Sequence, residues 1–300
     1  MKRRTAVIAV IISAVCFGTL AIFTSLAYRQ GAEPLQLLAW RFGAASLLLG
    51  GYFAIIRPRA LWVGRGDLGR YAVLAVAGYG AASLCFFFAL LHADAGVVAV
   101  LFYTYPALVT LAARLFGREA LDLPRAVAIA LTFAGCALVV DPFSGGQGVS
   151  TAGVLLGLGA AVGYASFNVL SHRWLPGRSR GVLMTYTFGF NTIAIVFIAS
   201  LVGAPLAPVG WTWETWMLLG AIVLVPTFAA VLLYLRAMRQ IGPAQASIIS
   251  TFEPLVTIGL AALVLGERLS IPQAAGAVLV LAGVVLAEFH VRDLDEVAIV

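Results

Sequence analysis

The sequence predicts an all-α integral membrane protein in which ten transmembrane helices form two inverted five-helix repeats around a central cavity. Three observations predict this fold. Hydrophobic residues make up 62% of the 300-residue chain and charged residues only 11%, with a mean hydropathy of +1.02, whereas a soluble domain carries about 25% charged residues. Apolar segments of membrane-spanning length recur along the chain, and the second half repeats landmarks of the first.

The predicted spans follow one another with short connections. Each contains about 20 mainly apolar residues, enough to cross a bilayer as a helix. In order they are 5–28, 34–56, 68–91, 95–115, 124–141, 151–172, 180–202, 214–237, 242–265 and 271–291. The first span follows Lys2, Arg3 and Arg4 as a signal peptide would, but its apolar part is longer and has no small-residue cleavage site. We therefore expect an uncleaved first helix.

The basic residues predict the orientation of the chain. With the N-terminus inside, sixteen of the 19 lie in or beside inner loops and termini, whereas Arg29 and Arg268 lie outside and Arg41 lies within a helix. By the positive-inside rule, both termini are predicted to be cytoplasmic in a multi-pass protein of the cell (inner) membrane. The net charge of +6 therefore reflects topology, and no nucleic acid is expected as a partner.

The second half of the chain repeats the first at a shift of 148 residues without gaps. The matched pairs include Pro106 with Pro254, Glu119 with Glu267, Leu121 with Leu269, Pro124 with Pro272 and Gly135 with Gly283. The predicted units are a first repeat at 1–141, a linker at 142–150, a second repeat at 151–291 and a cytoplasmic tail at 292–300. Because five spans is an odd number, the second repeat must be inverted, and inverted repeats are typical of secondary transporters.

Two stretches that this shift superposes resemble the paired signature halves of the EamA family in the drug/metabolite transporter superfamily. They are "YTYPALVTLAARLFGREALDLPRAVAIALTFAGCALV" at 103–139 and "TFEPLVTIGLAALVLGERLSIPQAAGAVLVLAGVVL" at 251–286. The resemblance covers essentially the whole chain. It implies a ten-helix exporter of small metabolites, amino acids and aromatic amino acids among them, and it says little about the particular substrate.

Polar and aromatic residues are predicted to cluster near the bilayer midplane, the depth at which transporter sites lie. Glu253 is eleven residues into the ninth span, roughly 16 Å at about 1.5 Å per residue. Its repeat mate is Tyr105, and neighbouring pairs supply further candidates. The predicted substrate-binding residues are Tyr79, Tyr103, Tyr105, Tyr164, Asn191, Thr227 and Glu253. The alternative for each is structural packing or a hydrogen bond to a nearby backbone.

Two charged residues within spans have several interpretations. Glu253 either couples a proton to transport, attracts a substrate ammonium, or satisfies backbone groups freed by Pro254. Arg41 either snorkels outward, pairs with an acid such as Glu253 or Glu267, or anchors a substrate carboxylate. Pro106 and Pro254 are predicted hinges, because proline removes a backbone donor and kinks a helix.

The predicted function is secondary, non-ATP export of small metabolites, foremost neutral or aromatic amino acids, by alternating access. Its alternatives are export of other small metabolites or drugs, such as nucleobases or cationic compounds, an intramembrane enzyme, or a structural membrane protein. No catalytic residue, metal site or cofactor is predicted, since the histidines lie at separate helix ends and no nucleotide-binding motif is present. The expected partners are a small-molecule substrate and membrane lipid.

Overall fold

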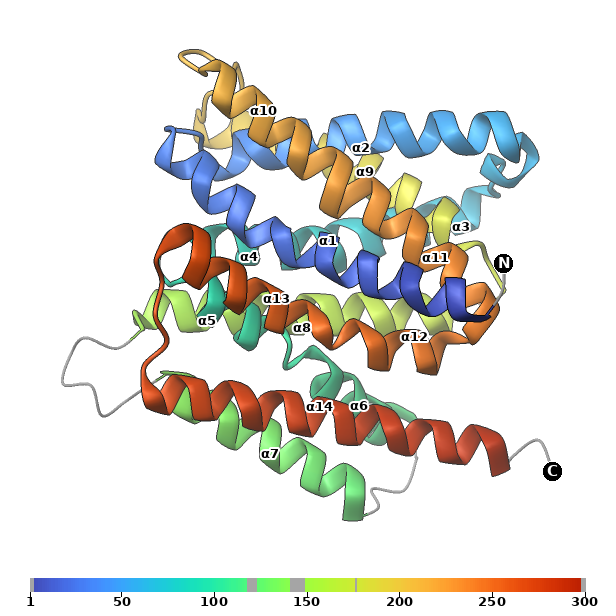
Figure 1. Ribbon diagram of the computed structural model, residues 1–300. Coiled ribbons are helices and arrows are strands. Elements are labelled where there is room, and N and C mark those ends of the chain that lie inside the picture. The colour runs from blue at the N-terminus through green and yellow to red at the C-terminus, as the bar shows by residue number, and fades with distance from the viewer. Residues whose placement is uncertain (1–2, 118–122, 141–148, 176, 298–300) are drawn as a thin grey trace.

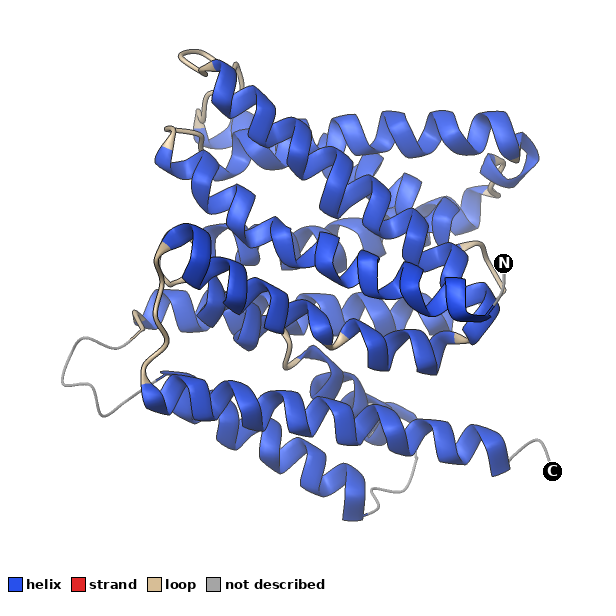
Figure 2. Ribbon diagram, viewed as in Figure 1, coloured by secondary structure: helices blue, strands red, loops and turns tan. Residues whose placement is uncertain are grey.

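The computed structural model describes residues 3–117, 123–140, 149–175 and 177–297, and within these ranges the regular structure is entirely helical (Figures 1 and 2). The first half of the chain contains α1 (Arg3–Arg29), α2 (Pro34–Ile56), the short 3-10 helix η1 (Pro58–Leu61), α3 (Arg65–Val73), the π-helical η2 (Leu74–Gly80), α4 (Ala81–Ala89), α5 (Ala95–Phe102), α6 (Tyr105–Gly117) and α7 (Leu123–Val140). α3, η2 and α4 form one continuous span, Arg65–Ala89.

Within its described residues, the second half contains corresponding α-helices in the same order, but it lacks a counterpart of η1 and has an additional π-helical turn, η4. Its elements are α8 (Thr151–Trp174), α9 (Arg180–Val202), α10 (Trp213–Ile222), the π-helical η3 (Val223–Ala229), α11 (Ala230–Ile241), α12 (Pro243–Ser250), α13 (Phe252–Leu260), the π-helical η4 (Ala261–Leu265) and α14 (Ile271–Val297). In the described part of the chain, eight helices are long and apolar enough to cross a membrane, and α7 and α14 contribute two shorter apolar helices. Together they correspond to the ten predicted spans.

The packing of the helices has the two-fold pattern that the repeat predicts. α1 packs against the α10–α11 span and against α13, and its repeat counterpart α8 packs equivalently against η2–α4 and against α5–α6. α1 begins at the end of the bundle where α14 ends, whereas α8 begins at the opposite end (Figure 1). The two halves are therefore inverted. We call the end where α1 begins the terminal end, and the other the distal end.

α7 and α14 lie together along one side of the bundle (Figure 1), and glycines allow their close approach. A Cβ on Gly135 would lie 2.6 Å from the Gly276 carbonyl oxygen, and one on Gly283 would lie 2.6 Å from the Ala128 carbonyl oxygen. The shift of 148 exchanges these two contacts, since it relates Gly135 to Gly283 and Ala128 to Gly276. The pairing therefore shows the repeat at atomic detail.

Two pairs of helix interruptions also follow the repeat, whereas the π-helical η4 has no counterpart in α6. η2 and η3 are π-helical turns at equivalent places in the third and eighth spans, offset by one residue from the register of 148. The fourth span breaks at Tyr103 (φ −70°, ψ 5°) and the ninth at Thr251 (φ −63°, ψ −10°), which are repeat mates. Each break comes three residues before a predicted hinge proline.

The predicted boundaries differ from the structure mainly at the end of the chain. α14 continues through Val297, six residues beyond the predicted span and into the predicted tail. Hydropathy predicts where the apolar part of a helix stops, but the helical backbone need not stop there, because Arg, Leu and Glu favour helix in water as well. Residues 142–148 of the predicted linker lie outside the described residues.

Candidate functional site

Five of the seven predicted binding residues meet between the two halves. Tyr79 lies in η2, Tyr103 and Tyr105 flank the break between α5 and α6, Tyr164 lies in α8, and Glu253 lies in α13. The ring centroids of Tyr105 and Tyr164 are 4.7 Å apart, those of Tyr103 and Tyr105 5.7 Å, and those of Tyr79 and Tyr164 6.2 Å. We call these five residues the tyrosine–glutamate cluster.

Glu253 lies at the edge of this cluster and faces the protein interior rather than the lipid. Phe252 and Leu255 form the exposed face of α13, at 54% and 49% exposure, whereas Glu253 is half-buried beside Tyr103. On the neighbouring face, Thr257 donates a hydrogen bond to the Gly18 carbonyl of α1 at 3.1 Å. The carboxyl group is therefore held at the junction of α1, α5 and α13.

The proline at 254 explains the role of Tyr103. A proline cannot donate to the carbonyl four residues earlier, so Pro254 leaves the Ser250 carbonyl without its helical partner. The Tyr103 hydroxyl lies 2.6 Å from this oxygen and 3.2 Å from Oε2 of Glu253. Since Tyr103 belongs to the first half of the chain and Ser250 to the second, the loosened turn is held by a hydrogen bond between the halves.

Thr227 and Arg41 form a second polar group, around Pro226 within η3. Pro226 leaves the Ile222 carbonyl without its usual donor, and the Thr227 hydroxyl donates to that oxygen at 2.8 Å. Nε of Arg41 in turn donates to Thr227 Oγ1 at 2.9 Å, and the guanidinium lies 5.3 Å from the centre of the Phe42 ring and 5.4 Å from that of Phe87. Arg41 is 4% exposed, so it does not snorkel to the surface.

Asn191 of α9 performs a similar task for the π-turn of the first half. Its amide donates to the Ala75 carbonyl of η2 at 3.0 Å and to the Thr187 carbonyl at 2.9 Å. α9 thus bonds to the π-turn of the third span as α2 bonds to that of the eighth. Asn191 and Thr227 are each 1% exposed. In this conformation they therefore stabilise π-turns and do not line an open space.

The predicted pairing of Arg41 with an acid is not present among the described residues. Glu267, one of its proposed partners, lies in the loop before α14 and accepts hydrogen bonds from the backbone N–H groups of Ala95 and Gly96 at 3.0 and 3.1 Å. It thereby caps α5 from the other half of the chain. Burial raises the pKa of the Glu267 carboxyl, and these two N–H groups counter part of that rise.

Open space occurs at the distal end, away from the tyrosine–glutamate cluster. A pocket of about 360 Å³ lies beside the Glu267 loop and is lined by Ser25, Tyr28, Arg29, Leu90, Asp94 and Glu267 among others. Its lining comes from both halves of the chain. Within the cluster itself, Phe102 and Phe167 fill the space between the tyrosines, with Phe102 5.2 Å and Phe167 6.2 Å from the Tyr164 ring.

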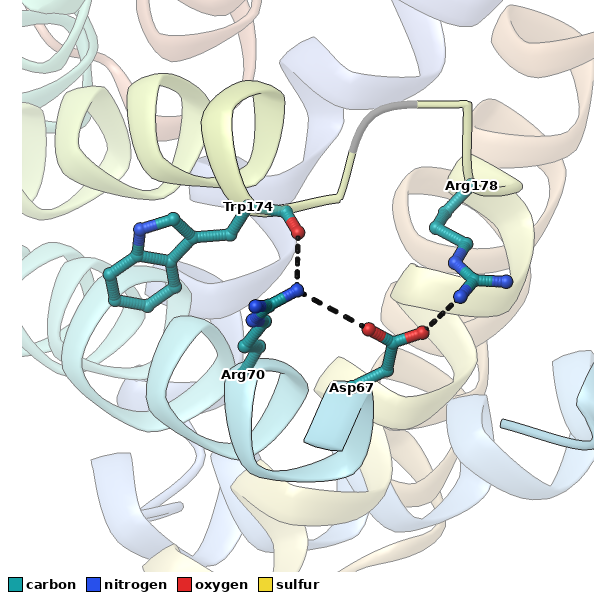
Figure 3. Close-up of polar contacts among 4 residues, drawn as sticks. All are labelled: Asp67, Arg70, Trp174 and Arg178. Atoms are coloured by element: carbon teal, nitrogen blue, oxygen red, sulfur yellow. Dashed lines mark hydrogen bonds and ion pairs between the residues drawn. The ribbon is translucent and has the colours of Figure 1, made fainter. Parts of the chain in front are cut away.

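At the terminal end, charged residues join the halves (Figure 3). Asp67 in α3 forms an ion pair with Arg178 between α8 and α9, and Arg70 donates to the Trp174 carbonyl at 3.2 Å. Arg70 and Asp67 are also 3.6 Å apart. Polar contacts between the halves are therefore present at both ends of the bundle as well as at its centre.

Sequence reasoning missed Phe102, Phe167 and Pro226 as parts of this region. The aromatic pair looks like ordinary apolar filling of a membrane helix, so nothing in the sequence marks it. Pro226 was a readable signal, because it stands inside an apolar span directly before the candidate Thr227. Its repeat mate is Gly78, however, so a comparison that looks for identical residues passes over it.

Comparison with known proteins identifies the kind of protein that carries this geometry. The sequence profile of the EamA-like transporter family matches residues 4–141 and again residues 151–289. The chain belongs to this family. It is a multi-pass membrane transporter of repeated architecture.

Relatives of similar length support the same assignment. The chain is 26% identical over 285 residues to an uncharacterized transporter of Archaeoglobus fulgidus, covering 93% of this chain and 94% of the relative. It is 27% identical over 274 residues to the uncharacterized transporter YcbK of Bacillus subtilis, covering 89% and 87%. A crystal structure described simply as that of a protein matches with a TM-score of 0.66 at 19% identity, over 98% of this chain and 99% of its own, and is similar in fold.

Proposed function

We propose that this EamA-family protein is a secondary transporter that exports small metabolites, foremost neutral or aromatic amino acids, by alternating access. The tyrosine–glutamate cluster carries the proposal. Four aromatic rings suit the apolar side chain of such a substrate, and a carboxyl group at their edge suits its ammonium. The cluster also lies where inverted repeats place a transporter site.

Arg41 offers a positive charge for the carboxylate of such a substrate. Its guanidinium packs on Phe42, whose ring is 6.1 Å from that of Tyr79 in the cluster. A cation buried among aromatic rings, with a threonine hydroxyl as its neighbour, is suited to a substrate carboxylate.

The repeat supports the mode of transport. The proposed moving units are residues 1–141 and 151–291. The proposed hinges are Pro106 and Pro254, and each follows the helix break in its own half by three residues. The distribution of basic residues supports an inner membrane location with both termini cytoplasmic. The terminal end would then face the cytoplasm.

Purified protein in liposomes tests this function, because no other transporter or ATP is present. We expect exchange of labelled L-phenylalanine for internal unlabelled L-phenylalanine, slower exchange of L-alanine, and a large loss in Tyr105→Ala. Glu214→Gln is the control, since Glu214 lies exposed at the start of α10. Exchange of a nucleobase or a quaternary cation without amino-acid exchange would contradict the proposed substrate class.

A further inference from the structure

The contacts of one hydroxyl group indicate the charge state of Glu253. A tyrosine hydroxyl has a single hydrogen, and that of Tyr103 lies near two acceptors, the Ser250 carbonyl at 2.6 Å and Oε2 of Glu253 at 3.2 Å. The shorter contact takes the hydrogen. Without this hydrogen the Ser250 carbonyl would have no donor from its own helix, because Pro254 has no N–H group.

An ionised carboxylate would be the stronger acceptor for this hydrogen and is expected to have the shorter contact. Hydrogen bonds from a hydroxyl to a carboxylate anion are charge-assisted and shorten to about 2.5–2.7 Å. Here the carboxyl contact is the longer one by 0.6 Å. A protonated Glu253 is compatible with both contacts, since its own O–H can point to the Tyr103 oxygen while Tyr103 donates to Ser250.

Among the residues that the structure describes, no positively charged side chain contacts the Glu253 carboxyl group to keep it ionised. The elements packed against α13 are α1, α5 and η4. Their titratable groups near this depth are Tyr103, at the end of α5, and Cys16 of α1. Tyr79, Tyr105 and Tyr164 complete the cluster, and Tyr234 of α11 lies near Tyr164. Arg41 is engaged with Thr227. An unpaired carboxylate away from water is costly, whereas a neutral carboxyl group with an acceptor is not.

We propose that Glu253 is a proton-binding site that holds a proton in this conformation and carries it through the transport cycle. The step is the addition of one proton to one carboxylate oxygen and its later release, with no other bond changed. When the halves move and water reaches the cluster from one side, the carboxyl group exchanges its proton with that side. Because the ionised form of the same carboxyl group is the proposed partner of the substrate ammonium, proton and substrate bind to Glu253 in turn, and alternating access exchanges one for the other across the membrane. This coupling rests on the proposed function, but the protonation of Glu253 does not.

Infrared difference spectroscopy of the purified full-length protein tests the protonation directly. At neutral pH we expect the spectrum of the wild type minus Glu253→Gln to contain the C=O stretch of a protonated carboxyl group. Glu214→Gln is the matched control, and it should remove only carboxylate bands because Glu214 is exposed to water. In Tyr103→Phe the protonated band should persist and shift to higher frequency, because the acid has lost its acceptor.

Loss of carboxylate bands alone in Glu253→Gln would overturn the proposal. If Glu253→Gln fails to fold, the shift in Tyr103→Phe decides, and an unshifted spectrum there overturns the proposal as well. The coupling is measured in liposomes, where a pH gradient should drive accumulation of labelled L-phenylalanine by the wild type. If the pH gradient changes neither the rate nor the extent of L-phenylalanine uptake, the proposed coupling is wrong. A protonated band without any amino-acid exchange contradicts the proposed function and leaves the proton site standing.

Discussion

Removal of the Tyr103 hydroxyl, alone and together with Pro254, tests how the broken ninth span is stabilised. In Tyr103→Phe the Ser250 carbonyl loses the donor that lies 2.6 Å away. Leaving a buried carbonyl unpaired costs about 1–3 kcal/mol, so we expect the free energy of unfolding to fall by that amount. Tyr103 is 3% exposed, which limits replacement of the donor by water.

The same substitution should cost much less when residue 254 has an N–H group. In Pro254→Ala the alanine donates to the Ser250 carbonyl as in an uninterrupted helix. Tyr103→Phe in this background should cost under about 1 kcal/mol, the remainder coming from the contact with Glu253, so the two changes should couple by roughly 1–2 kcal/mol. Unfolding of the four proteins in mixed micelles of a mild detergent and dodecyl sulfate measures the cycle. Additive effects would refute this account of the break.

Three further substitutions test other contacts by the same unfolding measurement. Arg41→Lys should lower stability by about 1–3 kcal/mol, because an ammonium lacks the planar group that bonds Thr227 and lies over the rings; an unchanged protein would contradict that contact. Gly276→Val should cost about 1–3 kcal/mol by forcing α7 and α14 apart, and a neutral effect would show that the helices do not cross there. Asp67→Asn should cost less than about 1 kcal/mol, because the Arg178 side chain is 56% exposed; a loss several times larger would mean that this ion pair is essential to the fold.

Much of the architecture could be predicted from the sequence because the bilayer imposes simple rules. Span length and hydropathy predicted ten helices, and the register of Pro106 with Pro254 predicted the place of the paired breaks. The end of α14 could not be predicted in this way, since hydropathy marks where the apolar residues end but not where the helical backbone ends.

The candidate site was harder to predict because depth and repeat position say nothing about direction. Tyr79, Tyr105 and Tyr164 face one another, as their ring contacts show. Thr227 is the repeat mate of Tyr79, yet it bonds the Ile222 carbonyl directly before η3, and Asn191 bonds the Ala75 carbonyl of η2. Where a span changes from α-helix to π-helix depends on its packing against other spans, and this packing cannot be deduced from a single sequence.

The most direct test of the central claim is whether the tyrosine–glutamate cluster is reached from both sides of the membrane. Tyr105→Cys, made in protein lacking Cys16, Cys85 and Cys136, is exposed to a membrane-impermeant thiol reagent added from one side and then from the other. Phe252→Cys is the control, because residue 252 lies on the face of α13 that is exposed to lipid rather than to water. The account predicts that Tyr105→Cys is labelled from either side and protected by L-phenylalanine, while the control is not labelled. Labelling of Tyr105→Cys from neither side, or from one side only under all conditions, would contradict alternating access at this site.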